Sequence, residues 1–88
     1  MQVIEVAAGL IHRDGHYLIA RRKPGAHLAG FWEFPGGIRE VGESLTECLQ
    51  RELFEELSVR IDHPILYQII RHDYLDQIIE LHFFRCAI

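Results

Sequence analysis

One amphipathic helix constrains the fold of this 88-residue chain more than any other feature. Residues 43–57 carry apolar side chains at helical spacing, namely Leu45, Cys48, Leu49 and Leu53. Ser44 and Glu47 match a capping box, in which each side chain bonds the other residue's backbone amide, so the helix should begin there. A chain of this length forms one domain. We therefore expect a single α/β domain over residues 1–88.

The rest of the chain is rich in strand formers. We expect strands over 3–12, 17–22, 31–34, 59–61, 66–74 and 78–87. Asp14-Gly15 predicts a tight hairpin after the first strand, and Pro35-Gly36-Gly37 predicts a turn before the helix. The order β-β-β-α-β-β-β predicts a mixed sheet with the helix on one face.

Composition excludes several classes of protein. The net charge of −4 argues against a polymeric nucleic acid as partner, because such binding needs a cationic face. No apolar run approaches the ~20 residues of a membrane helix, and residues 1–5 show no secretory leader. Cys48 and Cys86 lie in apolar runs and are interpreted as reduced core thiols of a cytoplasmic protein.

The helix has an anomaly in its acidic residues. On a helical wheel, Glu52 and Glu56 fall inside the apolar stripe and Glu55 lies one step to the side. Such like-charge neighbours repel. Arg51 can pair with Glu47 or Glu55 but is not expected to serve Glu52 and Glu56 as well. Divalent Mg²⁺ or Mn²⁺ would neutralise these carboxylates, and a carbonyl of the Gly36-Gly37 turn could complete the shell.

Carboxylate-held Mg²⁺ usually takes its other ligands from waters and substrate phosphates. This predicts a metal site for a phosphorylated small molecule. The alternative is a glutamate-rich surface helix stabilised by its cap and by the ion pairs of Arg51.

The spacing resembles a known motif. Gly37, Glu43 and the run Arg51-Glu52-Leu53-Phe54-Glu55-Glu56-Leu57-Ser58-Val59 resemble the Nudix box, G-x5-E-x7-R-E-U-x-E-E-x-G-U, where U is a bulky apolar residue. The one departure is Ser58 in place of the glycine that ends the helix in a left-handed conformation. Arg21-Arg22, His27 and the run from Trp32 to Gly37 resemble the MutT branch of the Nudix hydrolases.

The resemblance implies a Nudix-type α/β/α sandwich with a mixed sheet. Family members continue past the position of Ile88 into a loop and a helix, so this domain would lack the C-terminal helix. The implied cofactor is Mg²⁺ or Mn²⁺. The implied reaction is hydrolysis of a nucleoside triphosphate to the monophosphate and pyrophosphate, in the manner of enzymes that remove 8-oxo-dGTP from the nucleotide pool.

Roles follow by position in the motif. The implied catalytic residues are Glu43, Arg51, Glu52, Glu55 and Glu56. Metal would be held by Glu52, Glu55, Glu56 and the carbonyl of Gly37, with Glu43 supporting the site and Arg51 orienting the glutamates. Substrate would be bound by Arg22, His27, Phe34 and Asp76.

Several alternatives remain open. The substrate could be CTP, another pyrimidine nucleotide or a nucleoside diphosphate derivative. The chain could also be a non-catalytic module that binds a nucleotide or a partner. We expect a homo-oligomer that covers the final hairpin, and we interpret Trp32 as core and Asp76 most simply as a hairpin residue.

Overall fold

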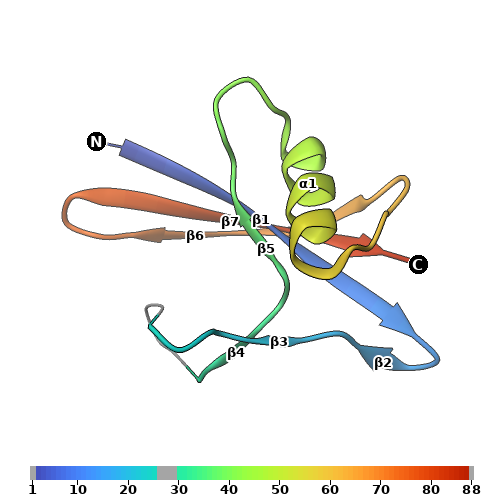
Figure 1. Ribbon diagram of the computed structural model, residues 1–88. Helices are drawn as coiled ribbons and strands as arrows, with labels where there is room; N and C mark the ends of the chain where they lie inside the picture. Colours follow the sequence, from blue (N-terminus) through green and yellow to red (C-terminus); the bar gives the residue numbers. More distant parts are fainter. Residues whose placement is uncertain (1, 26–29, 88) are drawn as a thin grey trace.

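The computed structural model describes residues 2–25 and 30–87, which form one mixed sheet, a small two-stranded ribbon and a helix (Figure 1). The elements are β1 (Gln2–Arg13), β2 (His16–Tyr17), β3 (Ala20–Arg21), β4 (Trp32–Glu33), β5 (Gly36–Ile38), α1 (Leu45–Leu57), β6 (Ile65–Asp73) and β7 (Gln77–Cys86). The expected position of His27 lies outside the described residues.

The sheet is built around a central parallel pair, β1 and β7. The strand order is β2-β1-β7-β6, and β5 also pairs with β1. The register of the parallel pair runs from Gln2 opposite Gln77 to Ile11 opposite Cys86, while β6 is antiparallel to β7. The fold is therefore the mixed α/β arrangement that the sequence predicts.

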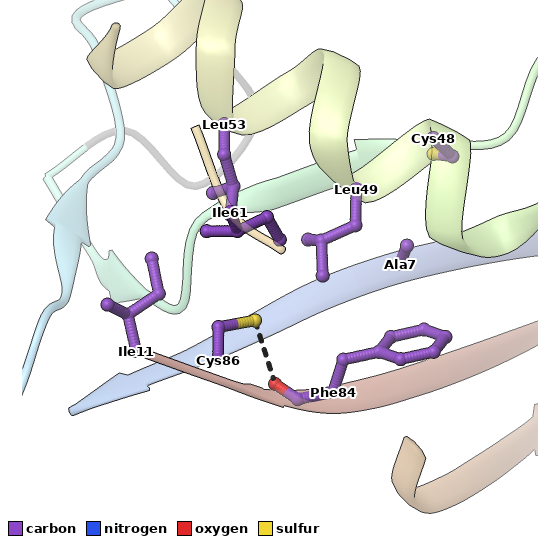
Figure 2. Packing of buried hydrophobic residues seen from close by; sticks show 8 residues of the cluster. All are labelled: Ala7, Ile11, Cys48, Leu49, Leu53, Ile61, Phe84 and Cys86. Carbon is purple, nitrogen blue, oxygen red and sulfur yellow. Dashed lines mark hydrogen bonds between the residues drawn. The ribbon is translucent and has the colours of Figure 1, made fainter. Parts of the chain in front are cut away.

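The core lies between α1 and one face of this sheet (Figure 2). From the helix, Cys48, Leu49 and Leu53 are fully buried. They meet side chains of β1, β7 and the segment after the helix, namely Ala7, Ile11, Ile61, Phe84 and Cys86. Each leucine buried in this way contributes about 1.5–3 kcal/mol. This packing fixes the rotation of the helix and hence the direction of its glutamates.

Both ends of α1 follow the local sequence. Ser44 accepts a hydrogen bond from the Glu47 amide at 3.0 Å, and Glu47 accepts one from the Ser44 amide at 2.8 Å, which confirms the capping box. Ser58 ends the helix at φ 56° and ψ 31°, so the serine adopts the left-handed conformation that glycine adopts most easily.

Three expectations about strands are wrong. In place of one strand over 17–22, the chain forms two short strands, β2 and β3, that pair with different partners, β1 and β4. Gly36 and Gly37, expected in a turn, belong to β5, which is antiparallel to β1. Residues 59–61 form no strand, because the Val59 amide bonds Leu53 at the helix end and Gln50 donates to the Ile61 carbonyl.

The sheet face opposite α1 is not covered by a helix in the part of the chain that the structure describes. Since side chains alternate along a strand, Val6 and Ala8 of β1 face this side together with Leu81 and Phe83 of β7. In ranges 2–25 and 30–87, α1 is the only helix, and it is too short to cross a membrane.

Candidate active site

Gly37 and Glu52 bring β5 and α1 into direct contact. A Cβ atom at Gly37 would overlap the carboxyl group of Glu52, so only glycine leaves room for that side chain. The neighbouring Gly36 is constrained more strictly, because a Cβ there would overlap backbone atoms of Ala7 and Ala8, which cannot move aside. The two glycines let β5 approach both β1 and the helix closely.

Arg51 holds several glutamates of the site at once. Its Nε and Nη2 atoms donate to the two Glu43 carboxyl oxygens at 3.1 and 2.8 Å. Its Nη1 donates to Glu52 at 3.0 Å and to Glu55 at 2.9 Å. The expectation that Arg51 serves only Glu47 or Glu55 is therefore wrong, since Glu47 is used in the helix cap and the guanidinium fork reaches Glu52 as well.

This arrangement stabilises the charged form of Glu43. The hydrogen bond from Arg51, followed by one from the Glu40 amide, lowers the pKa of Glu43 to about 2. The same contacts raise the pKa of Arg51 above its ordinary value. Glu43 and Arg51 thus form an ion pair in which both groups are charged at neutral pH.

Glu56 lies at the exposed edge of the site beside Glu52. Its pKa is raised to about 7, first by desolvation and then by the negative charge of Glu52. The nearby Gly36 amide lowers this pKa in part, so the Glu56 carboxyl lies beside the glycine strand. The site therefore has negative charge that Arg51 does not neutralise.

Two cavities lie beside these residues: Gly36 and Gly37 line one, and Glu56 lines the other. The larger, of about 430 Å³, lies against the sheet face opposite α1, between Gly36, Gly37 and the ribbon of β3 and β4. Its floor is apolar and comes from β1, β5 and β7, namely Val6, Ala7, Ala8, Ile38, Leu81 and Phe83. The smaller, of about 310 Å³, is lined by Ala20, Arg21, Arg22, Lys23, Glu33, Glu56 and Leu57.

Arg22 and Glu33 line both cavities. The Arg22 Nη1 atom donates to both Glu33 carboxyl oxygens at 3.0 Å. Sequence reasoning missed Glu33, although its place in the run from Trp32 to Gly37 could have drawn attention to it. The cationic cavity with Glu56 and the apolar cavity thus share one wall.

The predicted substrate residues are only partly brought together. Phe34 lines the apolar cavity, and its ring packs edge-on against Tyr17 and Phe83, with ring centroids 6.4 and 6.3 Å apart. Asp76 lies in the turn between β6 and β7, at the end of the sheet where β1 begins, and it lines neither cavity. The structure thus favours the hairpin interpretation of Asp76.

Trp32 is not a core residue, and that expectation is wrong. The residue is 62% exposed because β4 pairs with β3 in a ribbon outside the main sheet. Arg21 lies over the indole ring, with its guanidinium carbon 6.0 Å from the ring centroid. Cys48 and Cys86, in contrast, are buried and free as expected, and burial raises the pKa of each thiol to about 11.

Comparison with known proteins agrees with this geometry. The family model described as NUDIX domain matches residues 6–88. The chain belongs to the NUDIX family. Within the family, the relatives that follow confirm the MutT-like branch that the sequence predicts.

Three relatives show the range of this similarity. An "8-oxo-dGTP diphosphatase" of Proteus vulgaris is 39% identical over 82 residues, which are 92% of this chain and 73% of that protein. A "CTP pyrophosphohydrolase" of Escherichia coli is 49% identical over 59 residues, 67% of this chain and 44% of that protein. The crystal structure of a MutT NUDIX hydrolase from Burkholderia pseudomallei superposes with a TM-score of 0.87 at 27% identity. It covers all of this chain, which spans 69% of that one.

Proposed function

We propose that this NUDIX domain hydrolyses a nucleoside triphosphate, with water, to a nucleoside monophosphate and pyrophosphate. The observation that carries the proposal is the position of Glu52 and Glu56. These two carboxylates lie together beside the Gly36-Gly37 strand, and Glu56 lines a cationic cavity that shares Arg22 and Glu33 with an apolar one. Carboxylates bind metal, cationic side chains bind phosphates, and an apolar floor suits a nucleobase.

The donor set fits a hard divalent cation. We propose that Glu52, Glu55, Glu56 and the Gly37 carbonyl hold Mg²⁺ or Mn²⁺, both of which favour carboxylate and carbonyl oxygens. The raised pKa of Glu56 supports this, because desolvation and then the charge of Glu52 disfavour its charged form, and a bound cation would offset both. The Gly37 carbonyl accepts only a weak bond from the Cys48 thiol, at 3.5 Å, and keeps a lone pair. When bound, the cation would neutralise phosphate charge and lower the pKa of water.

The chain's own residues would position the substrate. Arg51 fixes the glutamates by its hydrogen bonds to Glu43, Glu52 and Glu55. The cations that line the smaller cavity, Arg21, Arg22 and Lys23, would bind the anionic phosphates. The ring of Phe34 would pack against the nucleobase on the apolar floor.

The proposed physiological role is removal of an oxidised nucleotide such as 8-oxo-dGTP. The name of the Proteus vulgaris relative supports this choice, and the name of the E. coli relative supports CTP as the alternative. His27 remains a predicted substrate residue on the resemblance alone. A cytoplasmic location is part of the proposal, since the thiols of Cys48 and Cys86 are free and a reducing compartment keeps them so.

A substrate panel tests the proposal. Pyrophosphate and monophosphate are measured with 8-oxo-dGTP, dGTP, CTP and dCTP at several Mg²⁺ concentrations. We expect metal-dependent release that is greatest with 8-oxo-dGTP and lost in Glu52→Gln. Glu47→Gln is the matched control, because glutamine can still complete the capping box on the same helix.

Two results would overturn parts of this proposal. Preference for CTP would keep the reaction and change the substrate. Nucleotide binding without pyrophosphate release, with Glu52→Gln identical to the parent chain, would instead indicate a non-catalytic binding module.

We also propose that a second copy of the chain pairs with β6. This strand is at the edge of the sheet and exposes a row of apolar side chains, namely Ile65, Leu66, Tyr67, Ile69 and Ile70. An edge of this kind offers unpaired backbone groups to another strand. Light scattering over a concentration series should show a dimer, and a monomer at every concentration would contradict this proposal.

A further inference from the structure

A second group of metal-ligating side chains lies on the central parallel strands. Glu5 of β1 is directly opposite Glu80 of β7, and His82 follows two residues later on the same face of β7. One ligand atom from each residue lies within 4.8 Å of the others. None of the three residues lines either cavity of the proposed active site.

The imidazole of His82 is directed at both carboxylates. Its Nε2 atom lies 3.4 Å from Glu80 Oε1 and 3.9 Å from Glu5 Oε2. The residue is only 7% exposed, whereas the Glu5 and Glu80 side chains are 30% and 23% exposed. A buried nitrogen thus faces the carboxylates of two side chains that are each partly exposed to solvent.

Each carboxylate is oriented by an arginine through its other oxygen. Arg39 Nε donates to Glu5 Oε1 at 3.0 Å, and Arg71 Nη1 lies 3.5 Å from Glu80 Oε2. Like charges directly opposite on neighbouring strands are unfavourable, so these arginines offset part of that repulsion. Glu5 Oε2 and Glu80 Oε1 are thereby left to face His82. Outer-shell hydrogen bonds orient the ligands of metal sites in the same way.

We propose that Glu5, Glu80 and His82 bind a divalent transition-metal ion, with Zn²⁺ as the probe. An imidazole nitrogen with two carboxylates favours such an ion over Mg²⁺, which prefers oxygen ligands alone. Ligand atoms about 2.0–2.2 Å from a tetrahedral zinc lie roughly 3.3–3.6 Å apart, close to the separation of His82 Nε2 from Glu80 Oε1. A solvent molecule would complete the shell through the exposed edges of the two glutamates.

The bound ion would fasten β1 to β7, because its ligands come from both strands. Its place is set by this strand register and not by the glutamates of α1. The inference therefore stands independently of the proposed nucleotide hydrolysis.

Zn²⁺ titration of the full chain by calorimetry tests the site. The parent for the titration is the Glu52→Gln, Glu56→Gln double variant, which removes competing carboxylates on α1. We expect one Zn²⁺ per chain, with affinity reduced at least ~10-fold by Glu5→Gln, Glu80→Gln or His82→Gln. The control is His16→Gln, which removes an exposed imidazole from β2 and should leave the affinity unchanged.

The melting temperature, measured with and without Zn²⁺, distinguishes loss of the site from loss of the fold. Zn²⁺ should raise the melting temperature of the parent but not of Glu5→Gln, whose partly exposed amide can still accept the bond from Arg39 and so preserves the fold. Equal Zn²⁺ affinity in the parent, Glu5→Gln and His82→Gln would overturn the proposal. So would the absence of Zn²⁺ binding by the folded parent.

Discussion

The Glu52 carboxyl group occupies the space where any side chain at Gly37 would lie. This contact joins β5 to α1 and holds Glu52 next to Glu56 and Arg51. Its consequence is that the glycine is required by the position of a functional side chain and not by an unusual backbone angle.

Gly37→Ala should therefore impair catalysis more than folding. The new methyl group would push the Glu52 carboxyl away from Arg51, and a misplacement of about 1 Å can cost roughly 100-fold in rate. The loss of stability should stay below the ~1–3 kcal/mol of an overpacked core, because the far end of Glu52 can swing aside. Pyrophosphate assays and urea unfolding measure the two effects.

Gly9→Ala is the matched control on β1. A Cβ there would lie 3.5 Å from Ile11, Leu49 and Leu53, which is ordinary contact. An equal loss of activity in both variants would show that the Gly37–Glu52 contact has no special importance.

Glu43 should make the protein sensitive to acid. Its pKa is about 2 in the folded state against 4.5 for the free side chain, because Arg51 bonds the charged form. The folded state binds fewer protons than the unfolded one between these values. The contribution of Glu43 is therefore complete above pH 4.5 and is lost as pH falls toward 2.

Urea unfolding at a series of pH values measures this contribution. Glu43→Gln should flatten the decline of the free energy of unfolding between pH 4.5 and 2, whereas Glu40→Gln, at an exposed neighbour, should not. A decline as steep in Glu43→Gln as in the parent chain would contradict the role of this ion pair.

Glu56 should titrate near neutrality in the metal-free protein. Its pKa is raised to about 7, so the folded state binds more protons than the unfolded one between pH 4.5 and 7. This group should therefore lower stability as pH rises through that window. Carboxyl ¹³C NMR should find the raised pKa and show it falling in Glu52→Gln, which removes the neighbouring charge. A pKa unchanged by that substitution would mean that desolvation alone is responsible.

Ser58→Gly should stabilise the helix end without changing activity. Ser58 has φ 56°, where glycine has no steric penalty, and its amide still bonds the carbonyls of Leu53 and Phe54. We expect a gain of about 0.5–1 kcal/mol. For a domain of this size that raises the melting temperature by roughly 4–8 °C per kcal/mol. Ser58→Ala should not increase the free energy of unfolding. An increase equal to that of Ser58→Gly would refute the conformational explanation.

Local sequence signals predicted α1 well because a helix is determined by neighbours in sequence. The Ser44 cap, the apolar stripe and the inward Glu52 all follow from spacing within fifteen residues. The same signals misplaced β5, because three residues containing two glycines form a strand only when β1 supplies a partner from about thirty positions away. Trp32 was misassigned for a related reason, since its burial depends on which sheet β4 joins.

The site was predictable in its residue types but not in its contacts. Spacing places Glu52, Glu55 and Glu56 together, and the family resemblance adds Glu43 and Arg51. Neither shows that Glu33 binds Arg22 between the two cavities, because that pair joins distant segments across the β3–β4 ribbon.

Manganese binding measured by electron paramagnetic resonance tests the central claim most directly, because it needs no substrate. The parent chain should bind Mn²⁺ at a site that the Glu52→Gln, Glu56→Gln double variant loses, with a drop in affinity of at least ~10-fold. Glu5→Gln, in the separate cluster on β1, should keep this site. Equal Mn²⁺ binding by the parent and the double variant would contradict the assignment of these glutamates as metal ligands.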